Sequence, residues 1–91
     1  MTKSNNFVIS EVTNVGTLRN GPMELTPILV SGSYTLFRRL NDSTYIVAFA
    51  VNTDFEKGTC TWASGDYLDG NFTRALSFFL AKLELGIEPL D

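Results

Sequence analysis

The chain has 91 residues, of which 44% are hydrophobic and 12% aromatic. This composition is typical of a globular domain and excludes a disordered chain, and the short length leaves little room for a deep active-site cleft beside a core. The formal net charge of −3 argues against a dedicated nucleic-acid-binding protein, because such a protein must neutralise several phosphates. We therefore expect a single domain over residues 1–91.

The sequence carries no signal for secretion or membrane insertion. Its N-terminus lacks an apolar core of signal-peptide length, and the longest apolar run, Tyr45 to Val51, is too short to cross a bilayer as a helix. The single cysteine, Cys60, cannot form an internal disulfide, which is usual for proteins of a reducing compartment. We expect a cytoplasmic protein with no membrane partner.

The first half of the chain predicts strands. Apolar and polar residues alternate from Phe7 to Thr13, which indicates a strand. Asn20-Gly21 is a turn signal. The run from Met23 to Val30 is expected to be extended, with Pro27 at an edge position or a bulge because proline has no N–H for the ladder. Gly32 ends this run.

The clearest expectation is a hairpin from Ser33 to Asn52. With Asp42-Ser43 as a two-residue loop, Leu40 faces Tyr45. The second strand, residues 44–52, is then apolar on both faces, which is typical of a central strand covered on both sides. Because one helix covers only one face, the other face is expected to be covered by the N-terminal segment or by a second copy of the chain.

A second hairpin is expected to turn through residues 53–58, since Gly58 suits the left-handed position that closes such a turn. The strand that follows, Thr59 to Ser64, carries Cys60 and Trp62 on one face. In this setting Cys60 is interpreted as a small core residue rather than a nucleophile.

A helix is expected from Phe72 to Leu85, with Gly86 just beyond its end. Asn71 or Asp69 would cap its start, and capping explains the acidic residues before the helix without any ligand. Together these elements predict an α+β domain, with an antiparallel sheet of about four or five strands and one C-terminal helix packed on it.

The chain lacks the residue patterns of the common enzyme and cofactor sites. It has no histidine, which removes the most frequent general base and metal ligand. Glycine-rich phosphate loops are missing, and residues 65–76 do not match the ligand spacing of a calcium loop. We therefore expect a non-enzymatic protein without a cofactor or metal, although two carboxylates that converge in space stay open as an alternative.

The helix carries the candidate interaction surface. At 100° per residue its core stripe comprises Phe72, Ala75, Leu76, Phe79, Leu80 and Leu83. Phe78 and Leu85 fall outside this stripe, and exposed apolar residues on a small domain mark contact surfaces. The predicted protein-binding surface has six residues: Phe78, Lys82, Leu85 and Ile87, with Asp66 and Asp69 as its charged rim. The alternative is that Phe78 and Leu85 seal the edge of the sheet.

Three arginines are candidates for weak nucleic-acid binding: Arg19, Arg38 and Arg39. Arg38 and Arg39 are neighbours in a predicted strand, so their side chains point to opposite faces and do not form one patch. Nucleic acid is therefore the less favoured partner.

From Tyr45 to Leu83 the order of features is an apolar strand, Trp62, Gly65, Tyr67, an acidic joint and an apolar helix. This order resembles that of small uncharacterised proteins carried by phages and other mobile elements of Gram-positive bacteria. The resemblance implies no enzymatic activity. It implies a context, because small acidic proteins of such elements often bind and block a host protein, as anti-CRISPR and anti-restriction proteins do.

The expected function is a non-catalytic protein-binding module, such as an inhibitor or regulator encoded by a mobile element. The alternative is a homodimer, in which the same helix surface or the doubly apolar strand joins two copies and the dimer binds a ligand.

Overall fold

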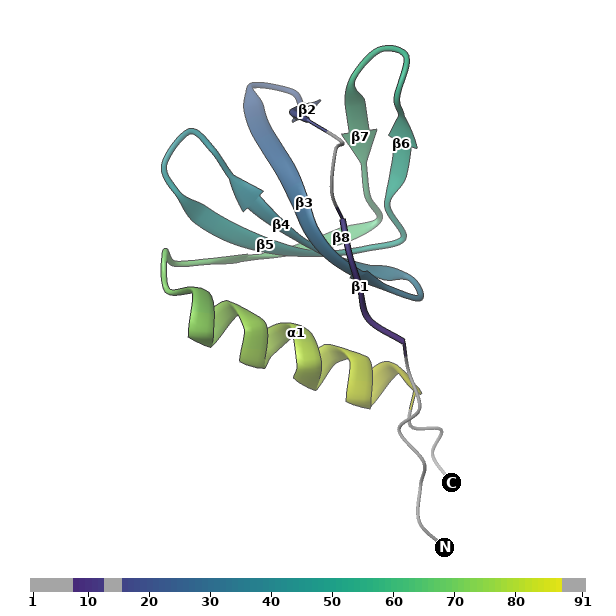
Figure 1. Cartoon of the computed structure of the whole chain (residues 1–91), viewed down its shortest axis with the longest axis vertical. Helices are drawn as coiled ribbons and strands as arrows, with labels where there is room; N and C mark the ends of the chain where they lie inside the picture. The colour runs from purple at the N-terminus through teal and green to yellow at the C-terminus, as the bar shows by residue number, and fades with distance from the viewer. Residues whose placement is uncertain (1–7, 13–15, 88–91) are drawn as a thin grey trace, which may run out of the picture.

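The computed structural model describes residues 8–12 and 16–87, with side chains as far as residue 84. Within them a mostly antiparallel sheet packs against one C-terminal helix (Figure 1). The elements are β1 (Ser10–Glu11), β2 (Leu18–Asn20), β3 (Met23–Ser31), β4 (Tyr34–Arg39), β5 (Thr44–Phe49), β6 (Asn52–Asp54), β7 (Thr59–Thr61), β8 (Ser64–Leu68) and α1 (Phe72–Ile87). The predicted α+β class is confirmed, but the described part of the sheet has eight strands rather than four or five.

Part of this difference arises from one long hairpin that bends. The register of the β5–β8 pair continues without a shift into the β6–β7 pair, from Tyr45 opposite Leu68 to Asp54 opposite Thr59. One arm therefore runs through β5 and β6 and the other through β7 and β8. The bend falls at Ala50, which adopts a left-handed φ of 60°.

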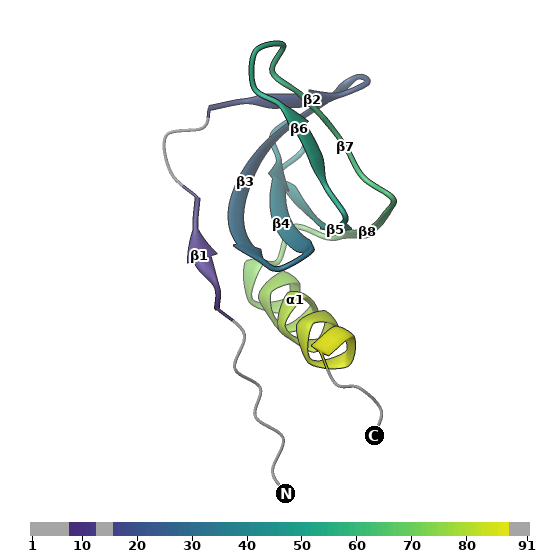
Figure 2. The same ribbon diagram turned by 90° about the vertical axis from the view of Figure 1, so that its right-hand side faces the viewer.

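The bend folds β6 and β7 over the face of the sheet opposite α1, so that the sheet curls into an open barrel (Figure 2). The strand order is β6-β7-β2-β3-β4-β5-β8, and β1 pairs with a different part of β3 from β2. The pair β2–β7 is parallel, with Arg19 opposite Thr59. There the Arg19 N–H donates to the Gly58 carbonyl oxygen at 2.8 Å, and Gly58 has the expected left-handed conformation.

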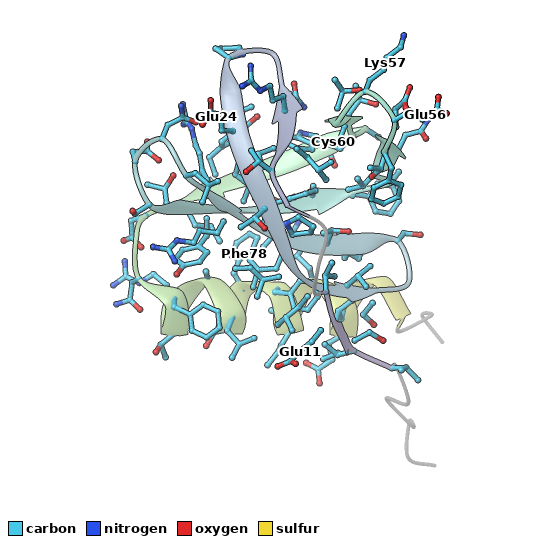
Figure 3. All side chains as sticks on the ribbon, turned by 45° about the horizontal axis from the view of Figure 1, so that its top comes forward. Glu11, Glu24, Glu56, Lys57, Cys60 and Phe78 are labelled. Carbon is cyan, nitrogen blue, oxygen red and sulfur yellow. The ribbon has the colours of Figure 1, made fainter. Side chains whose placement is uncertain are left out.

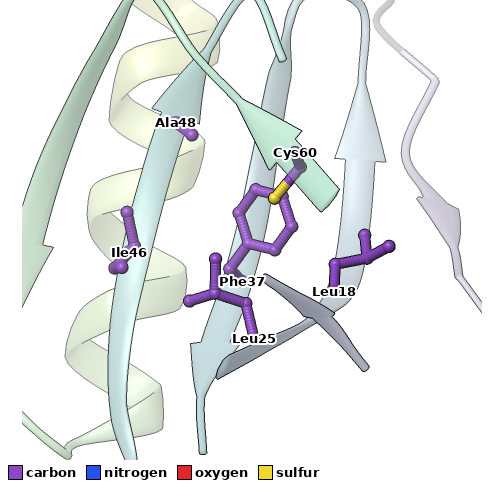
Figure 4. Packing of buried hydrophobic residues seen from close by; sticks show 6 residues of the cluster. All are labelled: Leu18, Leu25, Phe37, Ile46, Ala48 and Cys60. Carbon is purple, nitrogen blue, oxygen red and sulfur yellow. The ribbon is translucent and has the colours of Figure 1, made fainter. Parts of the chain in front are cut away.

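The centre of the sheet is buried on both faces, as the apolar pattern of residues 44–52 predicts. A helix-side cluster lies between the sheet and α1: Leu36, Tyr45, Val47, Ala75, Phe79 and Leu83. A barrel-side cluster lies on the opposite face (Figure 4): Leu18, Leu25, Phe37, Ile46, Ala48 and Cys60. The second face is therefore covered by β2 and β7 of the same chain, and a second copy is not needed to bury it.

The hairpin of β4 and β5 differs from its expected register by two residues. Arg38, rather than Leu40, lies opposite Tyr45, because the turn contains four residues instead of two. The Asp42 carboxylate favours this longer turn, since it accepts hydrogen bonds from the Thr44 hydroxyl group at 2.7 Å and the Thr44 N–H at 3.3 Å. A shift of two residues keeps each side chain of β4 and β5 on the face that the alternation predicts. Val51 is the exception in the expected hairpin: the alternation places it on the face of Leu36, but beyond the bend at Ala50 it packs against the barrel-side cluster.

Other strand predictions hold in part. The expected bulge in β3 is confirmed by a register shift between Pro27 and Leu29. Of the expected strand over residues 7–13, Ser10–Glu11 form β1, and the Val12 N–H donates one further hydrogen bond to the Ile28 carbonyl oxygen at 2.9 Å. Residues 7 and 13 lie outside the described residues. β8 was not expected, because its sequence, SGDYL, has turn-like residues and no clear alternation. It forms as a strand because it continues the long hairpin alongside β5.

The helix begins at Phe72, as predicted. The Asn71 side-chain oxygen accepts a hydrogen bond from the Arg74 N–H at 3.0 Å, which identifies Asn71 as the N-cap residue. The helix ends at Ile87, so Gly86 lies inside it rather than beyond its end.

Candidate functional site

The helix is rotated about its axis relative to the predicted orientation. Three residues of the predicted core stripe are buried: Ala75, Phe79 and Leu83. Phe72 and Leu80 belong to the same predicted stripe but are 42% and 37% exposed. Phe78 is half-buried and packs against the helix-side cluster. The rotation follows from β8, because this extra strand widens the sheet on the side of Phe78.

Three of the predicted site residues come together where α1 passes β8. The Lys82 ammonium group lies 3.4 Å from the Asp66 carboxylate and 5.6 Å from the centre of the Phe78 ring. The second distance is typical of a cation–π contact. Phe78 lies between α1 and the sheet (Figure 3). The trio therefore covers the border between the helix and the sheet, and it presents one ion pair to solvent.

The other predicted rim and tail residues do not join this trio. Asp69 lies at the start of the helix, where its carboxylate is 3.1 Å from the Arg74 guanidinium group and accepts a hydrogen bond from the Asn71 N–H at 3.1 Å. Asp69 therefore stabilises the turn before the helix, and of the two predicted capping residues only Asn71 accepts a hydrogen bond from an N–H of the helix. The side chains of Leu85 and Ile87 lie outside the described residues, so their part in the surface stays a prediction.

The three arginines do not form one basic patch. Arg38 and Arg39 are adjacent in β4, and Arg39 lies 3.6 Å from Asp42. Arg19 lies 3.6 Å from Glu24 on the neighbouring strand. Both ion pairs are partly exposed and reduce the local positive potential that phosphate binding needs.

An apolar surface is exposed on the opposite flank of α1. Phe72, Leu76 and Leu80 follow one another at intervals of four residues and so lie along one flank of the helix; we call them the apolar flank. β1 lies on the side of the sheet away from β8 (Figure 2). Next to β1, Val8 and Ile9 are 76% and 36% exposed. The flank that carries Phe78 and Lys82, which we call the Phe78 flank, borders the same buried stripe on its other side. Sequence periodicity therefore could not decide which of the two flanks is the more exposed.

A cavity lies inside the barrel, between β3 and β4 on one side and β6 on the other. Its volume is about 190 Å³. The described residues that line it are Val12, Leu18, Pro27, Val30, Thr35, Phe37, Val51, Thr53 and Phe55. All nine residues are uncharged and seven are apolar, so this barrel cavity is suited to apolar groups rather than ions.

The described residues contain no cluster of three or more side chains of the kinds that hold a metal ion. Cys60 is buried on the barrel side of the sheet, which confirms its interpretation as a core residue. Burial raises the pKa of its thiol, so Cys60 is protonated near neutral pH and is a poor nucleophile. Within the described residues, no helix has the length and apolar character to cross a membrane.

Comparison with known proteins supplies no relative of this chain. No family model matches the sequence, and neither the curated proteins nor the solved structures contain a significant match. The function is therefore inferred from the geometry.

Proposed function

We propose that this protein is a non-catalytic protein-binding domain whose partner contacts the apolar flank of α1. The observation that carries this proposal is the exposure of Phe72 and Leu80 on a helix whose opposite flank carries the half-buried Phe78 and the Lys82–Asp66 ion pair. Covering the exposed part of such a side chain contributes about 0.5–1 kcal/mol. Several of them on one surface can therefore support a specific contact.

The Phe78 flank is a second candidate surface for the same function. Its ring is half-buried, and Lys82 and Asp66 already satisfy each other. A partner there would have to compete with this ion pair, whereas a partner on the apolar flank covers hydrocarbon that solvent now contacts. This difference favours the apolar flank as the main contact.

The biological context of the proposal comes from the resemblance of residues 45–83 to small proteins of mobile elements. It supports an inhibitor or regulator that acts in the cytoplasm of a Gram-positive host by binding a host protein. Such a role needs a contact surface and a stable scaffold, and it needs no catalytic group or cofactor.

The test is a pull-down from a Gram-positive host lysate with the wild-type chain, Leu80→Asp and Ser77→Asp as baits. Ser77 is exposed on the solvent side of α1, so Ser77→Asp is the matched control for the added charge. We expect one discrete partner, identified by mass, with wild type and Ser77→Asp. With Leu80→Asp as bait, recovery of this partner should fall by about tenfold or more, because binding would bury a new carboxylate at the interface.

One further bait, Lys82→Glu, and one measurement separate the alternatives. If Lys82→Glu loses the partner while Leu80→Asp retains it, the contact surface is the Phe78 flank. If wild type retains no partner, the protein-binding proposal fails in this host. A mass that rises with concentration in light scattering, and does not rise in Leu80→Asp, would identify the apolar flank as the interface of a homodimer.

A further inference from the structure

We propose that the barrel cavity is a binding site for a small neutral molecule that consists of about one aromatic ring with one hydrogen-bonding group. This site is separate from the apolar flank of α1. The cavity lies on the barrel face of β4, whereas α1 packs on the other face. The proposal is therefore independent of protein binding and does not require it.

The size of the cavity limits the ligand. An apolar cavity of about 150 Å³ is known to stay free of water and to admit benzene. The barrel cavity, at about 190 Å³, accommodates one ring with a small substituent. The rings and branched chains that line it offer dispersion contacts on several sides, which suits a flat and rigid apolar group.

The charge of the surroundings limits the ligand further. A charged molecule would lose its hydration in a cavity whose nine lining residues carry no charge. Three acidic residues also neighbour the lining in sequence, since Glu11 precedes Val12 and Asp54 and Glu56 flank Phe55. Their negative potential disfavours carboxylates and phosphates. The ligand class is therefore neutral.

Thr35 is the reason that we expect the ligand to carry a hydrogen-bonding group. Its side chain lines the cavity, and a threonine hydroxyl group can donate one hydrogen bond and accept others. A ligand hydroxyl or carbonyl group beside Thr35 would therefore gain a hydrogen bond that a bare apolar ring cannot form.

Phe55 is placed to respond to the ligand. It belongs to the turn between β6 and β7 and contributes to the lining, but it is 70% exposed. An occupied cavity would offer this ring an apolar surface to cover. We expect the amide signal of residue 55 to shift when a ligand binds.

The experiment is a titration of the full chain with phenol and with benzene, followed by ¹H–¹⁵N NMR spectroscopy. We expect saturable shifts for phenol at Thr35, Phe37 and Val51, with benzene binding about fivefold more weakly because it forms no hydrogen bond to Thr35. Thr35→Val has nearly the same shape but lacks the hydroxyl group. It should lower phenol affinity to that of benzene and leave benzene affinity unchanged.

Three results would overturn the proposal: shifts that do not saturate up to the solubility limit of phenol, shifts confined to α1, or an unchanged preference for phenol in Thr35→Val. Val30→Phe fills the cavity and should abolish binding of both probes while the chain stays folded. If Val30→Phe unfolds, the Thr35→Val comparison decides alone. Leu80→Asp should bind phenol like wild type, which separates this site from the proposed protein-binding surface.

Discussion

The indole ring of Trp62 occupies the space that a side chain at residue 65 would need. A Cβ atom on Gly65 would lie 2.7 Å from the indole nitrogen of Trp62, which is well inside van der Waals contact. The indole in turn packs against the barrel-side cluster, 5.5 Å from the Phe37 ring. The W-x-x-G order in the sequence is thus a packing requirement: the glycine lets its own backbone in β8 approach the indole ring closely.

Replacement of Gly65 by alanine should therefore displace Trp62. We expect Gly65→Ala to lower the free energy of unfolding by about 1–3 kcal/mol and to shift tryptophan emission to longer wavelength as the ring gains solvent. Fluorescence and urea unfolding measure both effects. Ser64→Ala, at an exposed position in the same strand, is the control and should change neither. Unaltered emission and stability in Gly65→Ala would show that the ring has another place to pack.

Among the elements, α1 shows how far the sequence determines structure. Its start follows from local chemistry, because Asn71 supplies the acceptor that the first N–H groups need. Its buried residues Ala75, Phe79 and Leu83 follow from periodicity. Its rotation could not be predicted, because the choice between the Phe78 flank and the apolar flank depends on where the sheet ends. That edge is β8, whose residues have no strand pattern of their own.

The N-cap contribution can be measured directly. In Asn71→Ala the N–H of Arg74 loses its side-chain acceptor, so we expect a loss of about 1 kcal/mol in stability. For a domain of this size that corresponds to a fall in Tm of roughly 4–8 °C. Asn71→Ser, which keeps a hydroxyl acceptor, should recover most of the loss. A thermal scan in which alanine and serine behave alike would contradict the capping role.

For the whole molecule, the curled sheet depends on a narrow contact between β2 and β7. Arg19 opposite Thr59 is the parallel pair, and the Gly58 carbonyl group accepts one hydrogen bond beside it. Cys60 lies directly behind this contact. The sequence predicted the two hairpins but not their closure, because a parallel pair between distant segments leaves no local pattern. The barrel cavity, which depends on that closure, was missed for the same reason.

Labelling of Cys60 by a thiol reagent should report the opening of this contact. Gly58→Ala places alanine at a φ of +69°, at a cost of roughly 1–2 kcal/mol, and should raise the labelling rate about fivefold or more. Gly32→Ala is the control, because it places alanine at a similar φ of +57° in the turn between β3 and β4. It should raise the labelling rate of Cys60 less than Gly58→Ala does. Equal rates in the two variants would mean that Cys60 reacts only after global unfolding.

The pH dependence of this labelling has a defined sign. Burial raises the pKa of the Cys60 thiol, so at pH 8 the folded chain has less thiolate than free cysteine and should react more slowly. The raised pKa also means that the unfolded state loses its proton first as pH increases. Stability should therefore fall as pH rises above the ordinary thiol range.

The bent hairpin and the parallel contact also set an order of assembly. Neighbouring strands from β2 to β5 are joined by short turns, and each closes a small loop when it pairs. The contact between Arg19 and Thr59 closes a loop that contains the whole of β3, β4, β5 and β6. The entropy cost of closing a loop grows with its length, and contacts distant in sequence slow folding. The meander is therefore expected to form first and the barrel to close last, so that the barrel cavity exists only in the completed fold.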